Sequence, residues 1–399
     1  MKTLRPFLLL AHRWFGIIAA VWLFVAGLTG AIMVFTDEID YALNADLFTA
    51  SPGPSQSTDA LVGAVLAMHP GHYVSSIDLP DAEGEVAIAY YRHAGPAAAG
   101  HNHGASTQVL VDPATAVVLG ERQRGNIDLS RRGIMDFITK LHYTLQLGDV
   151  AKWLFGLVAF TWVLDHLISA VLSFPTAAKW KQSFQIRRGV GGPKRVFDLH
   201  RAVGLWLFPV TLALAVSSVY LNWGTDFRAL VGAFSPVSST YDARQPTVTA
   251  PDYSPPVGFQ RAIETATGKT GAVVDGVSFN PEKGLYRVRF FDERDVDPSV
   301  GRRYVYVDVS TGAIRADEHL LSGTSGDVVL GWQFPLHSGK AFGWSGRLVI
   351  FFTGLAICMF VVTGLLLWVR RAEARKAIQR KHDNVLQDPL PVAVLSVSE

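Results

Sequence analysis

The sequence has almost no cysteine and few charged residues. Cys358 is the only cysteine among 399 residues, which excludes an internal disulfide framework, a four-cysteine zinc or iron–sulfur site and the CxxCH attachment of c-type haem. Charged residues make up 18% of the chain, against roughly 25% in a typical globular protein. The formal net charge of +2 gives no signal for nucleic-acid binding. Any redox or metal chemistry must therefore depend largely on the twelve histidines and the carboxylates.

Long apolar runs explain the low charge content, since 49% of the residues are hydrophobic. About 20 predominantly apolar residues are needed to cross a hydrocarbon layer of roughly 30 Å. Four segments meet this condition: 7–35, 151–174, 200–223 and 346–369. The first is longer than the apolar region of a signal peptide, and His12 and Arg13 interrupt it. We therefore predict four transmembrane helices, the first of them retained as an anchor.

The distribution of basic residues predicts the orientation of these helices. The short loop 175–199 carries six basic residues against the single acid Asp198, and the tail 370–399 begins with a similar basic cluster. Basic loops stay on the cytoplasmic side of a membrane. We therefore expect a multi-pass protein of the bacterial inner membrane, with the N- and C-termini cytoplasmic and with segments 36–150 and 224–345 in the periplasm.

The two long polar segments read as small α+β modules. Alternating runs such as GEVAIAYYR and GLYRVRFF predict strands, and RRYVYVDVSTGAI predicts a strand entering a turn at Thr311 and Gly312. Segments 58–69 and 257–267 predict short amphipathic helices before those strands. The expected fold class is an α-helical membrane protein: a four-transmembrane-helix bundle with two extracytoplasmic α+β modules, each built as a helix followed by strands.

Histidines recur at matching places in the two halves. The motifs AHRWFG and LHRAVG place His12 and His200 directly before an arginine and four residues before a glycine. The motifs LHYTLQLG and PLHSGKAFG place His142 and His337 six residues before a glycine. The chain is therefore interpreted as two copies, about 190 residues apart, of one histidine at a cytoplasmic helix start and one at an external helix start.

This repeat predicts two paired imidazole sites at two depths, with His12 and His200 in the inner leaflet and His142 and His337 in the outer leaflet. Two imidazoles that face each other across a helix bundle form a bis-histidine site for a planar metal macrocycle. Without CxxCH the group would be non-covalent, so we expect two haem b. Taken singly, each histidine could instead be a polar anchor at the membrane interface.

Neighbouring residues fit this prediction. Small residues on the same helix faces leave room for a bulky ring, or serve helix packing: Gly16, Gly27, Ala31, Gly204, Thr211, Ala215 and Ser218. Arg13 and Arg201 are expected at the haem propionates, with Lys340 and Arg347 as external counterparts, although the arginines could be ordinary positive-inside anchors. The acceptors that hold the second ring nitrogen of each ligand cannot be identified from the sequence.

The remaining histidines allow several readings. His166 lies beside Asp165 within a predicted span. It could be an alternative inner ligand, a group that carries a proton or supports a ligand, or a polar contact to a neighbouring helix. The Gly/Ala/Pro-rich stretch around His93, His101 and His103 reads as a flexible loop, with incidental metal capture as the alternative. His69 and His72 flank a Pro-Gly turn and are expected at the surface.

Several long motifs resemble a known family. FDLHRAVGLW, TWVLDHLISAVLSFP and GTSGDVVLGWQFPLHSGKAFGWSGR resemble the PepSY-associated transmembrane-helix proteins, and most closely their iron-uptake branch, the inner-membrane ferric-siderophore reductases. The resemblance extends over nearly the whole chain and implies that the two outer modules are PepSY-like. It also implies that His12, His142, His200 and His337 ligate two b haems, and that electrons from the cytoplasmic side reduce Fe(III) held by a siderophore at the outer face.

The chemistry of this activity is consistent with the residues. Siderophores hold Fe(III) through oxygen donors, and reduction to Fe(II) weakens that binding. A bis-histidine haem has no open coordination position, which favours outer-sphere electron transfer. Substrate is expected between the outer modules, near the outer haem, around residues Asn222, Trp223, Trp332 and Lys340. No flavin or nicotinamide motif is present, so the donor is expected to be another protein, a soluble reduced cofactor or membrane quinol.

Two other functions remain open at this point. The chain could be a metallophore transporter or permease, with polar histidines along a pathway, although it has no broken-helix signature. It could also be a non-catalytic binding module that its helices anchor to the membrane. Neither alternative requires haem.

Overall fold

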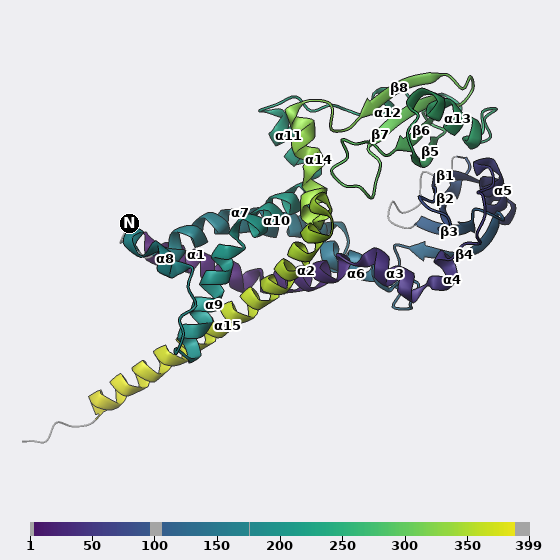
Figure 1. The fold of residues 1–399 in the computed structure, drawn as a ribbon. Coiled ribbons are helices and arrows are strands. Elements are labelled where there is room, and N and C mark those ends of the chain that lie inside the picture. The colour runs from purple at the N-terminus through teal and green to yellow at the C-terminus, as the bar shows by residue number, and fades with distance from the viewer. Residues whose placement is uncertain (1–3, 96–105, 175, 388–399) are drawn as a thin grey trace, which may run out of the picture.

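The computed structural model describes residues 4–95, 106–174 and 176–387. It has a helical part and, to one side, a part that contains the β-sheet (Figure 1). Both halves of the sequence contribute to each part, because the chain passes from helices to strands and back again twice.

Two helices within the described residues are long and apolar enough to cross a membrane, one at Asp149–Ser173 and one within Lys340–Arg380. They correspond to α7 (Asp149–Ser173) and α15 (Gly343–Gln387). Large apolar side chains on α7, such as Trp153 and Leu167, are exposed, as expected for a helix surface that faces lipid.

The other two predicted spans, 7–35 and 200–223, are each bent at a break between two helices, although the sequence showed no broken-helix signature. Helix α1 (Arg5–Ile18) meets α2 (Ala20–Met33) at 60°, and α9 (Gly192–Trp206) meets α10 (Phe208–Asn222) at 69°. The described chain thus has two candidate spans, or up to four if each bent pair is one span. At the second bend Pro209 lies in the first turn of α10, where proline starts a helix but cannot continue the preceding one.

Helix boundaries also differ from the predicted domain limits. Helix α9 begins within the predicted loop 175–199, which additionally contains α8 (Trp180–Ser183). Helix α15 continues well past residue 369 into the predicted tail. The reason is local, because residues 370–387 are rich in good helix formers and contain neither glycine nor proline.

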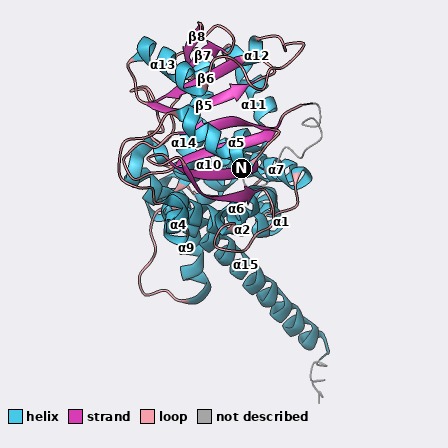
Figure 2. Ribbon diagram, turned by 90° about the vertical axis from the view of Figure 1, so that its right-hand side faces the viewer, coloured by secondary structure: helices cyan, strands magenta, loops and turns pink. Residues whose placement is uncertain are grey.

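In the described part of the chain the strands form one eight-stranded antiparallel sheet in the order β4-β3-β2-β1-β5-β6-β7-β8. Its strands are β1 (His72–Asp78), β2 (Ala87–His93), β3 (Ser106–Asp112), β4 (Val117–Arg124), β5 (Val274–Asn280), β6 (Leu285–Phe290), β7 (Arg303–Asp308) and β8 (Ile314–His319). Figure 2 shows the strands of both halves stacked in one series. The two outer modules expected from the sequence are therefore halves of one sheet.

The halves join where β1 pairs with β5. Ile77 lies opposite Val277 at this junction, and both side chains are almost fully buried. Helices α5 (Thr58–Met68) and α13 (Phe259–Thr270) pack against each other and against the sheet, and they contribute Leu61, Val65 and Ala262 to one shared core. The predicted order of a helix followed by strands is thus present in both halves, and burial of apolar side chains across the junction joins them.

Two helices lead from the sheet back to the spans. Helix α6 (Ile134–Thr144) follows β4, and α14 (Ser325–Ser338) follows β8. Thr324 and Asp327 form a capping box at the start of α14. The remaining short helices are α3 (Thr36–Leu43), α4 (Ala45–Phe48), α11 (Gly224–Gly232), α12 (Tyr241–Arg244) and the 3₁₀ turns Ala177–Lys179 and Lys340–Phe342.

Candidate functional site

The structure brings the four predicted histidines together as two pairs. His12 on α1 and His200 on α9 have ring centroids 6.2 Å apart, with the ring planes at 71°. His142 and His337 have ring centroids 6.1 Å apart, also at 71°. The two pairs therefore have nearly identical geometry, and their membership is the one that the sequence repeat predicts.

The second pair lies on different helices from those expected. His142 is near the end of α6 and His337 is near the end of α14. Both precede spans two and four, but they lie at helix ends and not at the predicted external helix starts. Residues with positive φ separate these helices from the spans that follow, including Gly148 at 75° and Gly343 at 56°. The glycines that the histidine motifs share are thus the breaks between two helices.

Every histidine of the two pairs has a polar partner at Nδ1. His12 Nδ1 lies 2.9 Å from the Asp165 carboxylate. The other three contacts are to hydroxyl oxygens: His200 to Thr363 at 2.8 Å, His142 to Thr29 at 3.0 Å and His337 to Ser217 at 2.9 Å.

The hydroxyl partners fix which ring nitrogen carries the proton. Thr29, Thr363 and Ser217 each donate their single hydroxyl proton to a carbonyl of their own helix, at 2.6, 2.7 and 2.8 Å. A hydroxyl that has donated its proton can only accept, so the imidazole Nδ1–H must be the donor. The same holds for His12, whose partner is a carboxylate. In all four rings Nε2 is then left with a lone pair, the form that binds a metal.

The Nε2 atoms of these histidines form no hydrogen bond to any residue that the structure describes. Two imidazoles on opposite sides of one metal ion, each with Nε2 about 2 Å from it, would have ring centres about 6 Å apart. The observed separations of 6.2 and 6.1 Å match this arrangement. The residues present therefore fit a metal macrocycle, which His12 and His200, or His142 and His337, would hold between them.

Glycines allow space beside the rings. No atom lies within 4 Å of the position that a Cβ would take on Gly16 or Gly204, each one turn after a histidine of the first pair. A Cβ on Gly30 would lie 3.0 Å from the His142 ring, and one on Gly364 would lie 3.5 Å from the His200 ring. These last two glycines directly follow Thr29 and Thr363. The Thr-Gly dipeptide does not by itself identify such acceptors, because Thr353-Gly354 of α15 has the same sequence and Thr353 bonds only to its own helix.

The four cations expected at the propionates fall into two groups. The Nε atoms of Arg13 and Arg201 are buried and have no hydrogen-bond partner within the described ranges. Arg201 also contacts Asp198 at 3.3 Å. Such unpaired donors are available to an anionic group.

The expected external counterparts already have protein partners. Lys340 donates to Ser299 at 2.9 Å and lies 3.7 Å from Asp37. Arg347 forms short hydrogen bonds to the Glu38 carboxylate. Although burial raises the pKa of Glu38, the hydrogen bond from Arg347 lowers it overall. The ion pair thus joins α3 to α15.

His166 has partners at both ring nitrogens. Nδ1 lies 2.8 Å from the Trp162 carbonyl, and Nε2 lies 3.0 Å from the Thr211 hydroxyl. Neither nitrogen is left for a metal, so His166 is a polar contact between α7 and α10. Its neighbour Asp165 instead holds His12.

The histidines in and beside strands β1 and β2 form a separate group. His69 lies 3.3 Å from Glu121 and stacks on Tyr91, and the His72 and His93 rings are 3.8 Å apart. His101 and His103 lie outside the described residues. Over the described ranges no cluster of three or more His, Cys, Asp or Glu side chains is arranged to hold a metal ion. A macrocycle held by either histidine pair would not require such a cluster, because it would supply the other metal ligands itself.

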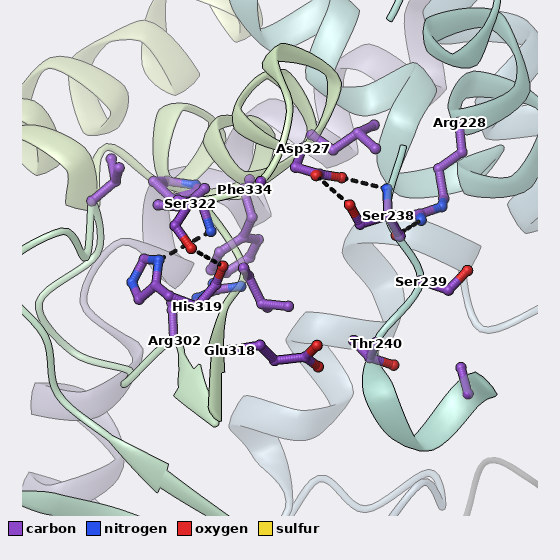
Figure 3. Close-up of a pocket in the computed structure, with 18 of the residues that line it drawn as sticks. Arg228, Ser238, Ser239, Thr240, Arg302, Glu318, His319, Ser322, Asp327 and Phe334 are labelled. Carbon is purple, nitrogen blue, oxygen red and sulfur yellow. Dashed lines mark hydrogen bonds between the residues drawn. The ribbon is translucent and has the colours of Figure 1, made fainter. Parts of the chain in front are cut away.

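The residues expected around the substrate are engaged elsewhere. Trp223 donates to the Trp153 carbonyl at 3.1 Å, Trp332 packs against Phe342 at 6.5 Å, and Asn222 bonds to its own helix. None of these residues, nor Lys340, lines the pocket drawn in Figure 3.

Comparison with known protein families identifies a match. A family model described as the PepSY-associated TM region matches residues 9–371. No curated protein matches the chain. The family and the apolar helices together indicate a membrane protein. Since the match runs from α1 into α15 and covers most of the sequence, the protein belongs to the PepSY-associated TM region family.

Proposed function

We propose that this protein is an inner-membrane di-haem b electron-transfer protein. It would reduce Fe(III) bound to a siderophore at the periplasmic face, with electrons from the cytoplasmic side, and release Fe(II). The single observation that carries the proposal is the pair of histidine sites with matching separations of 6.2 and 6.1 Å, in which every Nδ1 is occupied by an acceptor.

In this proposal His12 and His200 hold one haem, and His142 and His337 hold the other. When bound, each group supplies reversible one-electron transfer without an open coordination position for oxygen. Arg13 and Arg201, whose Nε atoms lack partners, would neutralise propionates of the first group. The hydroxyls and the carboxylate at Nδ1 fix each ring in the metal-binding tautomer.

The partners of Nδ1 support an outward direction of electron flow. Asp165 is the one carboxylate among the four partners, while the others are hydroxyls. A carboxylate draws the Nδ1 proton more strongly, which makes Nε2 of His12 the better electron donor to a metal and favours its oxidised state. The His12–His200 site is then the more reducing one. A transmembrane potential also favours outward movement of negative charge, by about 2.3 kcal/mol per 100 mV.

Haem analysis of purified protein tests the proposal. The wild type should contain about two non-covalent haems per chain, with the absorption of a low-spin iron with two axial imidazoles. The variants His12→Ala and His200→Ala should lose the same haem, and His142→Ala and His337→Ala should lose the other. His166→Gln is the control and should retain both, because both nitrogens of His166 bond to protein groups.

Two results would contradict the proposal. A colourless preparation would favour a metallophore transporter or a membrane-anchored binding module, neither of which requires haem. Retention of both haems in all four alanine variants would show that other residues are the ligands.

A further inference from the structure

A pocket of about 530 Å³ lies between the sheet and helices α10 and α14, which carry Ser217 and His337 (Figure 3). Its wall includes the segment Ser238–Arg244, the end of β8 and parts of α10 and α14. The volume is in the range of about 300–1,000 Å³ that is typical of small-molecule sites.

Two helices, α10 and α14, contribute residues both to the pocket and to the His142–His337 site. Phe334 lines the pocket and precedes His337 by three residues on α14. Tyr220 also lines it and follows Ser217, the partner of His337, by three residues on α10. Residues three apart on a helix are neighbours, with Cβ atoms about 5–6 Å apart. A ligand in the pocket would therefore lie about one helical turn from this histidine pair.

The pocket presents uncommitted hydrogen-bond donors. The guanidinium of Arg302 has no hydrogen bond or ion pair to any residue in the described ranges, since the contact from Arg302 to Asp295 uses the backbone nitrogen. Arg228 donates to the Ser238 carbonyl at 2.9 Å and keeps its other N–H groups. Guanidinium groups bind oxygen acceptors such as carboxylates in pairs of hydrogen bonds.

One residue of the pocket wall, Asp297, also carries an unsatisfied acceptor. Asp297 is 1% exposed, and its Oδ1 accepts two hydrogen bonds from Ser299. Its Oδ2 is buried and has no partner among the described residues. An unpaired buried carboxylate oxygen is costly, and a ligand N–H or O–H group would satisfy it.

The other charged groups of the wall are already paired. Glu318 accepts from the Tyr241 backbone at 2.8 Å and from Arg244 at 3.3 Å. His319 lies 3.0 Å from Asp295. Asp327 accepts from Ser238 and from the Thr324 backbone within the capping box. A ligand would therefore be recognised through Arg302, Arg228 and Asp297.

We infer that this pocket binds the substrate as an oxygen-rich Fe(III) chelate that carries at least one N–H or O–H donor. Ligand oxygens would accept from Arg302 and Arg228, and the ligand donor would bond to Asp297 Oδ2. The inference rests on the proposed function and assigns its substrate site. One electron from the reduced cytoplasmic or quinol donor converts Fe(III) to Fe(II), the chelator is chemically unchanged, and no covalent bond forms.

Gallium(III) complexes test the pocket without electron transfer, because Ga(III) resembles Fe(III) in charge and ligand preference but is not reduced. Binding of gallium citrate and of a gallium trihydroxamate to the full chain in detergent is measured by calorimetry. We expect at least one complex to bind. Arg302→Gln and Asp297→Asn should each weaken binding about tenfold or more, as loss of a charge-assisted hydrogen bond implies.

A second variant and a control make the result decisive. Ser239→Trp, at an exposed position of the pocket wall, should block binding without removing a buried charge. Arg315→Gln is the matched control, because Arg315 pairs with Asp308 away from the pocket. The inference fails if neither gallium complex binds, or if Arg302→Gln and Ser239→Trp leave affinity unchanged.

The same variants separate this inference from the proposed function. Gallium binding by a protein that lacks haem would overturn the proposed function and leave the pocket intact. Unchanged haem content with an unchanged KM for iron reduction in Arg302→Gln and Ser239→Trp would overturn the pocket alone.

Discussion

Each paired histidine depends on one acceptor from another segment of the chain. Thr363 holds His200, and its hydroxyl proton is committed to the Met359 carbonyl at 2.7 Å. Thr353 is another buried threonine of α15 that donates to its own helix, and it has no hydrogen bond to a histidine among the described residues. The two residues therefore form a matched pair.

Thr363→Val should therefore weaken haem binding at the His12–His200 site. It leaves the His200 Nδ1–H without an acceptor, and loss of such a partner costs about 10–100-fold in metal affinity. Thr353→Val should have no comparable effect. Haem titration of the apoprotein measures both, and an equal loss in the two variants would contradict the role of Thr363.

Asp165→Asn should raise the lower of the two midpoint potentials. An amide oxygen attracts the Nδ1 proton of His12 less than a carboxylate does, so the oxidised metal is less stabilised. The expected shift is about 59 mV, a tenfold change in a one-electron equilibrium. Optical redox titration measures it, with Asp149→Asn, at the start of α7, as control. A shift confined to the higher-potential centre would exclude this role of Asp165.

Among the helices, α2 and α15 cross with their backbones in close contact. A Cβ on Gly27 would lie 2.8 Å from the Gly354 carbonyl oxygen, and one on Gly354 would lie 2.6 Å from the Gly27 carbonyl oxygen. These helices carry Thr29 and Thr363, the acceptors for one histidine of each pair. The distance between α2 and α15 therefore affects the position of an acceptor in both histidine sites.

Gly354→Ala should destabilise the helical part by about 1–3 kcal/mol, the usual cost of overpacking, and lower haem occupancy at both sites. Thermal unfolding in detergent and haem content are the measurements. Gly232→Ala is the control, because no atom lies within 4 Å of a Cβ there. Loss of one haem alone, or an equal effect of Gly232→Ala, would show that the crossing does not couple the sites.

Across the whole molecule, the two halves are joined at the β1–β5 junction and between the helices. Arg289 of β6 bonds to Asp78 of β1 at 2.7 Å and also to Asp275 of β5. It therefore links the first half of the sheet to the second. In the helical part each histidine pair likewise takes one ring from each half.

Arg289→Met should lower the free energy of unfolding of the sheet by about 1–3 kcal/mol. It leaves two carboxylates close together and unpaired, a loss smaller than that of a fully buried pair because Arg289 is 25% exposed. Arg315→Met removes a more exposed pair and should cost at most about 1 kcal/mol. Denaturant unfolding followed by near-UV circular dichroism measures both, and equal losses would argue against a role for the junction.

The sequence predicted the parts of the fold that local pattern controls. Apolar length located the helical segments, alternation located the strands, and the repeat around His12 and His200 selected which rings would meet. The helical segments and strands depend on residues close together in the chain, and the histidine pairing follows from a repeat that is visible in the sequence.

Tertiary structure alone decided the bend between α1 and α2, the single sheet, the acceptors at Nδ1 and the pocket beside α14. These features depend on contacts between residues far apart in the sequence, such as Asp165 with His12 or Ile77 with Val277. Hydropathy and periodicity act within one segment, whereas hydrogen bonds and close packing between segments form only once the chain has folded.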